Sequence, residues 1–337
     1  MNGAVPVGWD DAAARSRCGH VLQSSAWARI REAQGWRAEY VRVGEPLPVA
    51  LVLWRALPLG SVAYVPRGPI VAPGDARGLA DALGALAALA RARGALFLKV
   101  DPELAPEEAA PALAAAGFRR APDVQPVLAT LVLDLAADEE ALLAGCDKDT
   151  RWSVRQGPKR GVTVREATTG DDDLRAFHAL YAGTGARAGF VTRTWAYYRL
   201  VWSTLIAAGL ATLRLAEIEG RAVAAAMTWR CGERDVYMYG ATSKEGRTAL
   251  AAYPLQWECI LAAKRRGAAR YDLGGVPVDL ARTDDPMRGP YVFKKGFGGS
   301  VVRFAGAHDV APRRLAYGAY RTLEPLYTRA LRLAARR

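Results

Sequence analysis

The sequence predicts an α+β protein built from two tandem domains, each a mixed sheet flanked by helices. A chain of 337 residues can bury two ordinary hydrophobic cores. Its composition is globular, with 51% hydrophobic and 24% charged residues. The order helix, three-strand meander, helix, strand, helix, strand then occurs twice. Residue identity between the two halves is low, so this is a repeat of pattern rather than of sequence.

The first half opens with a short amphipathic helix. Ser24 or Ser25 can cap it, and the apolar Trp27 and Ile30 lie three residues apart. Three apolar runs separated by turn residues follow and predict an antiparallel meander, at 38–43, 49–54 and 61–66. The other elements expected in this half are a helix over 77–93, a strand over 95–101, a helix over 106–116 and a strand over 127–135.

The second half repeats this order. Two helices come first, followed by three strands joined by tight turns, then a helix and two further strands. The ranges expected are 171–187 and 194–208 for the helices, 211–220, 221–230 and 233–241 for the meander, 249–266 for the third helix, and 270–275 and 300–306 for the last strands.

The domain boundary is expected in the charged stretch 136–160, where strand character disappears. We therefore predict a first domain over 1–145, a second over 146–310 and a basic C-terminal helix over 311–337. The boundary stretch is too short for a long helical hairpin, so no coiled-coil arm is expected. A docked helix with a solvated basic face, or a helix that contacts nucleic acid or membrane, would both fit the C-terminal pattern of Leu315, Tyr320, Leu323, Leu326 and Tyr327.

A formal net charge of +12 indicates polyanionic partners such as nucleic acid, phosphorylated substrates or an anionic membrane surface. The N-terminal residues MNGAVPVGWDD do not resemble a signal peptide, and no apolar run is long enough to span a bilayer. We expect a cytoplasmic protein with reduced thiols. A zinc site is not expected, because no CxxC spacing occurs among Cys18, Cys146, Cys231 and Cys259, and the histidines are His20, His178 and His308.

Several common catalytic and nucleotide-binding motifs are absent. The chain has no GxSxG elbow, no GxxxxGK[ST] loop and no GxGxxG after a strand. The order of elements in each half resembles the Gcn5-related N-acetyltransferase fold, whose members usually carry R/Q-x-x-G-x-G/A at the start of the helix that holds the acyl-CoA pyrophosphate. The nearest match here, residues 264–269, lies at the wrong end of its helix. An acyl-CoA donor and any metal or redox cofactor are therefore disfavoured.

The stretch YVFKKGFGG near the end of the second half is the strongest candidate for chemistry. Lys294 and Lys295 lie between Phe293 and Phe297, with glycines that allow a tight turn or a close approach to a ligand. A lysine held among aromatic side chains acts in a stronger field than in water, and its ammonium can stabilise an oxyanion during acyl transfer. A solvated basic turn is the alternative reading.

Other candidates are polar or aromatic residues at informative spacings. Arg193 and Tyr197 lie four apart, which places them on one face if both are helical, and arginine suits bidentate phosphate or carboxylate binding. A surface ion pair is the alternative for Arg193. Tyr237 and Tyr239 are expected on one face of a strand, either as packing or at a site. Asp101 ends a strand and either caps the next helix or belongs to a site.

Taken together, these features resemble the FemABX family, the aminoacyl-tRNA-dependent transferases that build peptidoglycan cross-bridges. The similarity covers nearly the whole chain. The family resemblance implies two Gcn5-like domains without a coiled-coil arm. It is carried by LQSSAWARIREAQGW, PRGPI, TRWSVRQGPKRGVTV, YMYGATSKEGR, YPLQWECILAAKRRGAARYDLGG and GPYVFKKGFGG.

The resemblance also implies roles for individual residues of the second half. Lys294 would stabilise the oxyanion or the tRNA end during transfer. Arg193 and Tyr197 would hold the phosphates or sugar of the precursor, and Tyr239 would line the peptide channel.

For the remaining residues, the resemblance implies that Asp101 would contact the stem peptide of the acceptor, and proton removal would fall to Asp101 or to the substrate itself. Phe293 would contribute to substrate binding, and Lys295 would contact tRNA or phosphate. Arg31 stands where the family usually has a lysine, four residues after the tryptophan of the first helix. Its charge is kept but its geometry differs.

The activity implied is the transfer of an amino acid from aminoacyl-tRNA to the stem-peptide amine of a UDP- or lipid-linked muropeptide. The ester is already activated, so no enzyme nucleophile and no cofactor beyond the tRNA co-substrate is required. Peripheral contact with the inner face of the membrane fits the basic C-terminus. An acyl-CoA-dependent N-acyltransferase and a non-catalytic tRNA- or envelope-binding relative are the alternatives.

Overall fold

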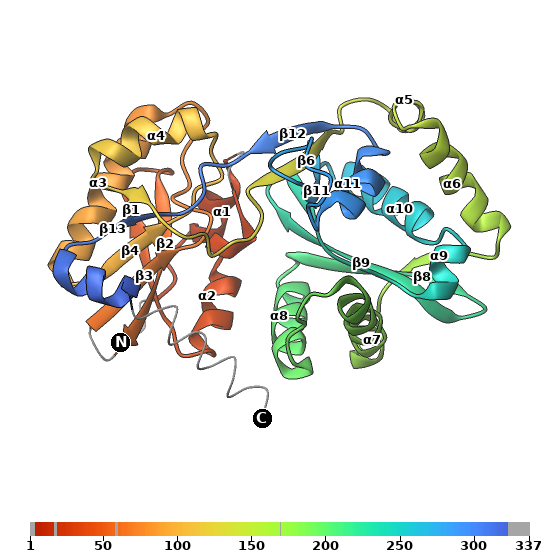
Figure 1. The fold of residues 1–337 in the computed structure, drawn as a ribbon, viewed down its shortest axis with the longest axis horizontal. Helices are drawn as coiled ribbons and strands as arrows, with labels where there is room; N and C mark the ends of the chain where they lie inside the picture. Colours follow the sequence, from red (N-terminus) through yellow and green to blue (C-terminus); the bar gives the residue numbers. More distant parts are fainter. Residues whose placement is uncertain (1–3, 17–18, 58–59, 169, 323–337) are drawn as a thin grey trace. The chain divides into compact units, whose positions relative to one another are not determined.

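The computed structural model describes residues 4–16, 19–57, 60–168 and 170–322. The chain divides into two compact units, which are described separately. Unit 1 comprises Met1–Cys18, Leu22–Pro126 and Phe304–Arg337, and unit 2 comprises Gly19–Val21 and Val127–Arg303. Figure 1 shows the secondary-structure elements of both units.

Unit 1 is built on a six-stranded mixed sheet in the order β1-β2-β3-β4-β13-β5. Strands β1, β2 and β3 form the expected antiparallel meander, whereas β3 and β4 run parallel. Strand β13 is antiparallel to both β4 and β5. The strands are β1 (Arg37–Arg42), β2 (Val49–Leu57), β3 (Gly60–Val65), β4 (Phe97–Val100), β5 (Arg119–Arg120) and β13 (His308–Val310).

Helices cover both faces of this sheet. Leu79, Leu83 and Leu86 of α3 recur at helical spacing and pack in the core with Val52 of β2. Trp9 of α1 packs edge-on against Tyr40 of β1. The next residue, Val41, packs against the core that contains α3, and adjacent strand residues point to opposite faces, so α1 lies on the other face of the sheet. The helices are α1 (Trp9–Ala14), α2 (Ser25–Glu32), α3 (Ala76–Ala92) and α4 (Pro106–Ala115), with a 3-10 turn at Val21–Gln23.

The predicted N-cap of the first amphipathic helix is confirmed at Ser24. Its Oγ accepts a hydrogen bond of 3.1 Å from the backbone N–H of Trp27, while Ser25 is the first residue of α2. Trp27 and Ile30 are both buried, as their spacing predicts.

Unit 2 is built on a seven-stranded mixed sheet in the order β12-β6-β11-β10-β9-β8-β7. Strands β8, β9 and β10 form the second antiparallel meander, and β10 and β11 run parallel. The sheet consists of β6 (Ala129–Asp134), β7 (Thr163–Glu166), β8 (Ala211–Ile218), β9 (Arg221–Cys231), β10 (Arg234–Thr242), β11 (Arg270–Gly275) and β12 (Ser300–Arg303).

Helices flank both faces of the second sheet as well (Figure 1). Helices α7 and α8 lie on one face, and α10 lies on the other with α6 packed against it. The helices of unit 2 are α5 (Glu139–Ala144), α6 (Lys148–Lys159), α7 (Asp171–Ala188), α8 (Trp195–Ala207), α9 (Lys244–Thr248), α10 (Ala252–Arg265) and α11 (Arg288–Lys295).

The division between the units differs from the sequence-based boundary at 145/146. It falls between Pro126 and Val127, because β6 pairs with β11 and β12 of the second sheet. The residues from Phe304 onward belong to unit 1 rather than to the second domain, because β13 pairs with β4. The charged stretch 136–160 is not a linker, since it contains helices α5 and α6.

Residues 314–322 form the described part of the C-terminal helix, which docks on unit 1. The rings of Tyr317 and Tyr320 lie 5.5 and 5.3 Å from the ring of Phe97. Leu315 is 93% exposed, so its assignment to the packed face was wrong. Leu323, Leu326 and Tyr327 lie outside the described residues.

The predicted fold class, α+β with two tandem mixed sheets flanked by helices, is confirmed, and the described residues contain no coiled-coil arm. The longest helix in the part of the chain that the structure describes is α7, with 18 residues. Across the same residues, no helix combines the length and apolar character that a membrane crossing requires.

Candidate active site

The parallel pairing of β10 with β11 stops at a glycine-lined corner of unit 2, where β11 nears its end and β10 continues to Thr242. Their ladder runs from Arg234 opposite Arg270 to Val236 opposite Asp272 and then stops. Beyond it Gly274 adopts a φ of 76°, and a Cβ there would lie 2.9 Å from the carbonyl oxygen of Tyr237. A side chain at Gly274 would be both strained and too close, so this approach of the two strands requires glycine.

Lys294, near the end of α11, reaches this corner. Its side chain is buried, and its Nζ donates a hydrogen bond of 2.6 Å to the carbonyl oxygen of Gly275. Burial lowers the pKa of Lys294 from its ordinary 10.5 to about 8, while the carboxylate of Asp272 acts in the opposite direction. Lys294 is therefore a cation in a desolvated place. One ammonium proton is used in the hydrogen bond to Gly275, and the others can be donated elsewhere.

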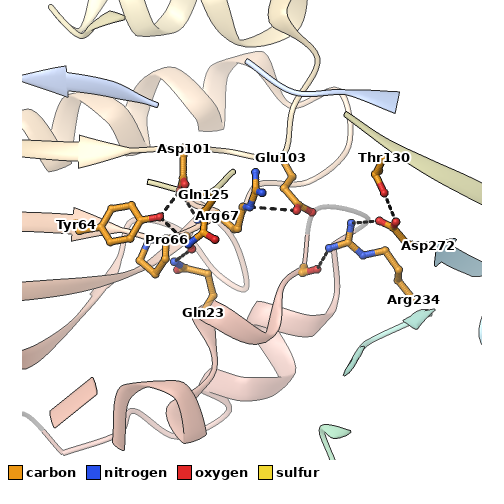
Figure 2. Close-up of polar contacts among 11 residues, drawn as sticks. Gln23, Tyr64, Pro66, Arg67, Asp101, Glu103, Gln125, Thr130, Arg234 and Asp272 are labelled. Carbon is orange, nitrogen blue, oxygen red and sulfur yellow. Dashed lines mark hydrogen bonds and ion pairs between the residues drawn. The ribbon is translucent and has the colours of Figure 1, made fainter. Parts of the chain in front are cut away.

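Asp272 organises the backbone around this lysine. Its Oδ1 accepts hydrogen bonds from Gly274 N at 2.7 Å and from Thr130 Oγ1. Its Oδ2 lies 3.7 Å from Nη1 of the buried Arg234, which also donates through Nη2 to the carbonyl of Gly19 (Figure 2). The carboxylate thus fixes the end of β11 at Gly274, and the carbonyl of the next residue, Gly275, binds Lys294.

The basic stretch is the end of a helix and not the solvated turn of the alternative reading. Helix α11 ends at Lys295, so its last two residues face different ways: Lys294 is buried and Lys295 is exposed. Phe293 packs with Tyr253 and Phe297 at ring distances of 5.1 and 5.3 Å.

The glycines of this stretch allow close approaches within the protein. A Cβ on Gly296 would collide with Thr150 Oγ1 of α6. A Cβ on Gly299, at φ 97°, would lie 2.7 Å from the carbonyl oxygen of Val132 of β6. These glycines therefore position α11 and β12 rather than approach a ligand.

A β-bulge separates Tyr237 from Tyr239 and overturns their expected shared face. Tyr237 pairs with Thr228 and Tyr239 with Met227, which are adjacent residues of β9. Directly paired residues share a face and adjacent ones do not, so the two tyrosines point to opposite faces of the sheet. Tyr237 packs in the main core of unit 2.

Tyr239 lies in an aromatic cluster on the α7–α8 face. Its ring lies 5.5 Å from that of Tyr181, and the rings around it also include Tyr198, Trp202 and Trp229. Burial raises the pKa of Tyr239 well above its ordinary value, so this phenol stays a neutral hydrogen-bonding group.

Arg193 and Tyr197 are brought together, as their spacing predicts, although Arg193 precedes α8 and is not helical. The Arg193 guanidinium lies over the Tyr197 ring, with its Cζ 4.8 Å from the ring centroid. Tyr198 joins this pair to the aromatic cluster, because its hydroxyl accepts a 3.3 Å bond from Arg193 N and its ring lies 6.1 Å from Tyr239.

In unit 1, Asp101 lies at the corresponding place, directly after strand β4 of the parallel pair. It is buried rather than being a simple helix cap: its Oδ2 accepts from Tyr64 OH at 2.7 Å and its Oδ1 from Arg67 N at 2.5 Å. Burial raises the pKa of Asp101 from 3.8 to about 6, against the opposing effects of Arg67 and Tyr64.

Further buried polar residues surround Asp101 at the ends of β3 and β4 (Figure 2). Arg67 adopts a φ of 54°, its Nε lies 3.4 Å from Glu103 Oε1, and its guanidinium lies over the Phe304 ring. Gln23 donates to the carbonyl of Pro66 and accepts from Leu51 N, which joins the 3-10 turn to the sheet.

Arg31 belongs to a different cluster of unit 1. Its Nη1 donates to Gln34 Oε1 at 2.5 Å, and its guanidinium lies 4.9 Å from the centre of the Trp36 ring. The side chain is thus held flat on an aromatic face, an orientation that a lysine in this position would not require.

Sequence reasoning missed several polar residues that shape these corners. Asp272 and Arg67 carried a usable signal, since both stand in quoted motifs, RYDLGG and PRGPI, next to strand ends. Thr130 and Arg234 carried none, because only the fold brings them to Asp272. Among the described residues, no cluster of His, Cys, Asp and Glu could hold a metal ion.

Comparison with known proteins identifies the family. The model of the FemAB family matches residues 9–111, 121–222 and 215–325, which is nearly the whole chain. The lipid II:glycine glycyltransferase of Staphylococcus saprophyticus subsp. saprophyticus is 24% identical over 389 residues, covering 93% of each chain. The protein of the same name from Staphylococcus aureus (strain USA300) is 24% identical over 394 residues, with the same coverage.

Solved structures agree with this assignment. A crystal structure of FemX superposes with a TM-score of 0.83 at 22% identity, covering 96% of this chain and 99% of FemX. The C-terminal domain of a putative lysylphosphatidylglycerol synthetase from Agrobacterium fabrum has a TM-score of 0.56 at 14% identity, covering 94% and 95%, and shares the fold alone. The chain is therefore a transferase that belongs to the FemAB family.

Proposed function

We propose that this enzyme transfers an amino acid from aminoacyl-tRNA to the stem-peptide amine of a peptidoglycan precursor, either UDP- or lipid-linked. Family membership and the lipid II:glycine glycyltransferase relatives support the reaction class and the acceptor. The observation that carries the proposal is the buried ammonium of Lys294, held at the carboxyl end of β11, where its parallel pairing with β10 has stopped. In open sheets with parallel strands, ligands commonly bind at such ends.

The reaction forms one bond and breaks another. The neutral amine of the stem peptide attacks the ester carbonyl, and a C–N bond forms as the carbonyl oxygen becomes an oxyanion. The ester C–O bond then breaks, the 3′ or 2′ oxygen of the tRNA leaves, and the proton lost by the attacking amine neutralises it. Because the ester is already activated, orientation alone can contribute roughly 7–11 kcal/mol in favourable cases.

Lys294 is assigned to the oxyanion. An ammonium in a desolvated site interacts with developing negative charge more strongly than it would in water. Its hydrogen bond to Gly275 O fixes Nζ before the substrate arrives, so little reorganisation is needed at the moment of reaction. The Lys294 side chain is buried, so little water surrounds the stem that carries the ammonium.

Other residues are assigned to substrate binding. Arg193 and Tyr197 present a guanidinium over an aromatic ring, which suits a phosphate next to a sugar, and Tyr239 contributes an aromatic wall. Lys295 is exposed and is assigned to a phosphate of the tRNA. In unit 1, Asp101 is assigned to the stem peptide of the acceptor. We place the reaction on the cytoplasmic side of the membrane.

The acyl-CoA alternative is disfavoured by the start of α10. Backbone N–H groups there, where the phosphates of an acyl-CoA would bind, already donate within the chain: Ala251 N to Gly246 O and Tyr253 N to Leu250 O. The glycine of the acyl-CoA motif is also missing from this helix start, where Leu250 adopts a φ of 62°.

The test is to incubate the protein with UDP-MurNAc-pentapeptide or lipid II and bulk tRNA charged with a mixture of amino acids. Mass spectrometry of the precursor should reveal a mass increase of one or more amino-acid residues, which also identifies the residue transferred. A mass increase that appears only with acyl-CoA would favour the N-acyltransferase alternative. Binding of tRNA without a product would favour a non-catalytic relative.

A further inference from the structure

A cationic hollow lies on unit 2, away from the Lys294 corner. It is a surface depression of about 670 Å³ bounded by α7, the start of β9, the end of β10 and helix α9. Its lining includes small apolar side chains, among them Ala176, Ala179 and Ala222. The basic residues of the lining are Arg187, Arg221, Lys244 and Arg247.

The cations of this hollow are poorly neutralised by the protein. Arg187 Nη1 and Arg247 Nη1 both donate to one carbonyl oxygen, that of Thr242, at 3.3 and 3.4 Å. Partial burial and the charge of Arg247 both lower the pKa of Arg187, so the two guanidiniums repel each other. Acids pair with only part of this cationic set: Arg221 lies 3.1 Å from Glu245 and 3.9 Å from Glu219. No acid is among the described residues that line the hollow.

The cationic surface continues past α9. A second depression shares Lys244 with the first and adds Arg160, whose Nη1 donates to the carbonyl of Thr248 at 2.6 Å. Its lining also includes one acid, Glu245, which is paired with Arg221. Both depressions therefore surround the same short helix, and the cations form an arc rather than a point. Such an arc fits successive charges of a polyanion better than a single small anion.

We propose that this hollow binds backbone phosphates near the 3′ end of the aminoacyl-tRNA. The shape favours RNA over a membrane, because a concave depression with small apolar groups in its lining accepts a sugar or base edge, whereas a bilayer surface is flat. The inference rests on the proposed function, since it places the donor substrate of that reaction.

The distance along β10 between the Lys294 corner and the hollow fits a bound RNA. The carbonyl of Tyr237 adjoins Gly274 near Lys294, and the carbonyl of Thr242 binds the two arginines. These two residues are five apart on strand β10. At about 3.3 Å per residue that separation is roughly 16 Å. A few extended nucleotides can cover it, so an RNA with its acyl ester at Lys294 can place a phosphate in the hollow.

The test compares two double variants with the same change of charge. Arg187→Ala/Arg247→Ala removes the pair in the hollow, and Arg265→Ala/Arg282→Ala removes two exposed, ion-paired arginines elsewhere on unit 2. The affinity of full-length protein for deacylated tRNA is measured by fluorescence anisotropy between 50 and 200 mM salt. Arg187→Lys/Arg247→Lys, which keeps both charges, serves as a folding and charge control.

The hollow variant should bind tRNA at least about tenfold more weakly at low salt, with the slope of log K against log salt reduced by about 1–2. The Arg265/Arg282 variant should match the unmodified protein, and the double lysine variant should retain most of the slope. Equal affinities for the two double alanine variants would overturn the inference and leave the proposed function standing.

Two further probes separate the remaining outcomes. If the unmodified protein does not bind tRNA, both the inference and the tRNA-dependent function fall. Coenzyme A and vesicles of phosphatidylglycerol and phosphatidylcholine are tested for binding in the same way. If one of them binds the unmodified protein but not the hollow variant, while both proteins bind tRNA equally well, the hollow serves that ligand and the inference is overturned.

Discussion

The Nζ of Lys294 lies 2.6 Å from the carbonyl oxygen of Gly275, so the end of helix α11 is bonded to the end of strand β11. This contact joins the basic stretch to the corner where the parallel pairing of β10 with β11 stops. It fixes an ammonium whose pKa burial has lowered to about 8. If Lys294 is the electrostatic catalyst, its substitution should affect the chemical step, whereas substitution of substrate-binding residues should affect KM.

Activity should fall at alkaline pH as Lys294 loses its proton. The attacking amine must be neutral, so kcat/KM should rise with pH until Lys294 titrates near its pKa of about 8 and then decline. Lys294→Arg keeps a charge that does not titrate in this range, so its alkaline decline should move to higher pH even if its rate is lower. A pH profile of single-turnover transfer checks this, and an unchanged alkaline limb in the arginine variant would contradict it.

Asp272 should set the position of that alkaline limb. Its carboxylate raises the pKa of Lys294 against the larger effect of burial, so Asp272→Asn should move the limb to lower pH. The variant should also unfold at a lower temperature, because the buried Arg234 loses its carboxylate partner.

The matched control for Asp272 is Thr130→Ala. It removes a hydrogen bond to the same carboxylate without removing the charge. Its alkaline limb should stay where it is in the unmodified protein, and a shift as large as that of Asp272→Asn would show that packing rather than charge is responsible.

Lys294 should also make stability depend on pH. Its folded pKa lies below the unfolded value of 10.5, so the unfolded chain binds more protons between about pH 8 and 10.5. The contribution of Lys294 to the free energy of unfolding is therefore fully present above about pH 10.5 and is lost as the pH falls through about 8. Denaturant titrations of Lys294→Met should lack this increment, and an identical pH dependence in both proteins would rule out a buried, charged Lys294.

The order of elements and both meanders follow from apolar runs and turn residues, which are local signals. Local signals do not show which sheet β6 and β13 belong to, because each strand joins its sheet by pairing with residues distant in the chain. A boundary based on composition therefore fell at 145/146, whereas the units divide at 126/127.

Among the candidate residues of both units, the sequence identified chemical groups better than it predicted their surroundings. Lys294 and Asp101 were singled out, yet their burial and hydrogen bonds depend on the fold. The bulge between Tyr237 and Tyr239 reverses the alternation that their spacing predicts, and no residue in VYMYGAT marks it. Asp272 and Arg67 were overlooked because a charged residue at a strand end is usually solvated.

Asp101 should produce an acidic limb in the pH profile. Burial raises its pKa to about 6, so kcat/KM should fall as pH drops through about 6, because the carboxylate is the form that binds a cationic stem peptide or accepts a proton. Tyr64→Phe removes a hydrogen bond that lowers this pKa and should move the limb upward. Asp101→Asn should lack the limb and have a higher KM for the acceptor. Retention of the limb in that variant would assign it to another group.

Arg193 should contribute to binding of the precursor rather than to the chemical step. Removing a charged contact to phosphate typically costs about 1.5–3 kcal/mol, so Arg193→Ala should raise the KM for UDP-MurNAc-pentapeptide by roughly 10–100-fold with little change in kcat. Arg199→Ala is the matched control, because Arg199 lies in α8 and forms an exposed ion pair with Asp171. Equal effects of the two substitutions would remove Arg193 from the site.

The most direct test of the account is single-turnover transfer by Lys294→Met. Methionine fills a similar volume but carries no charge. Loss of one preformed oxyanion stabiliser should reduce the rate of the chemical step by about 10²–10³-fold. Affinity for deacylated tRNA should fall only modestly, and circular dichroism should show a folded protein. A transfer rate equal to that of the unmodified protein would contradict the assignment of Lys294 as the electrostatic catalyst.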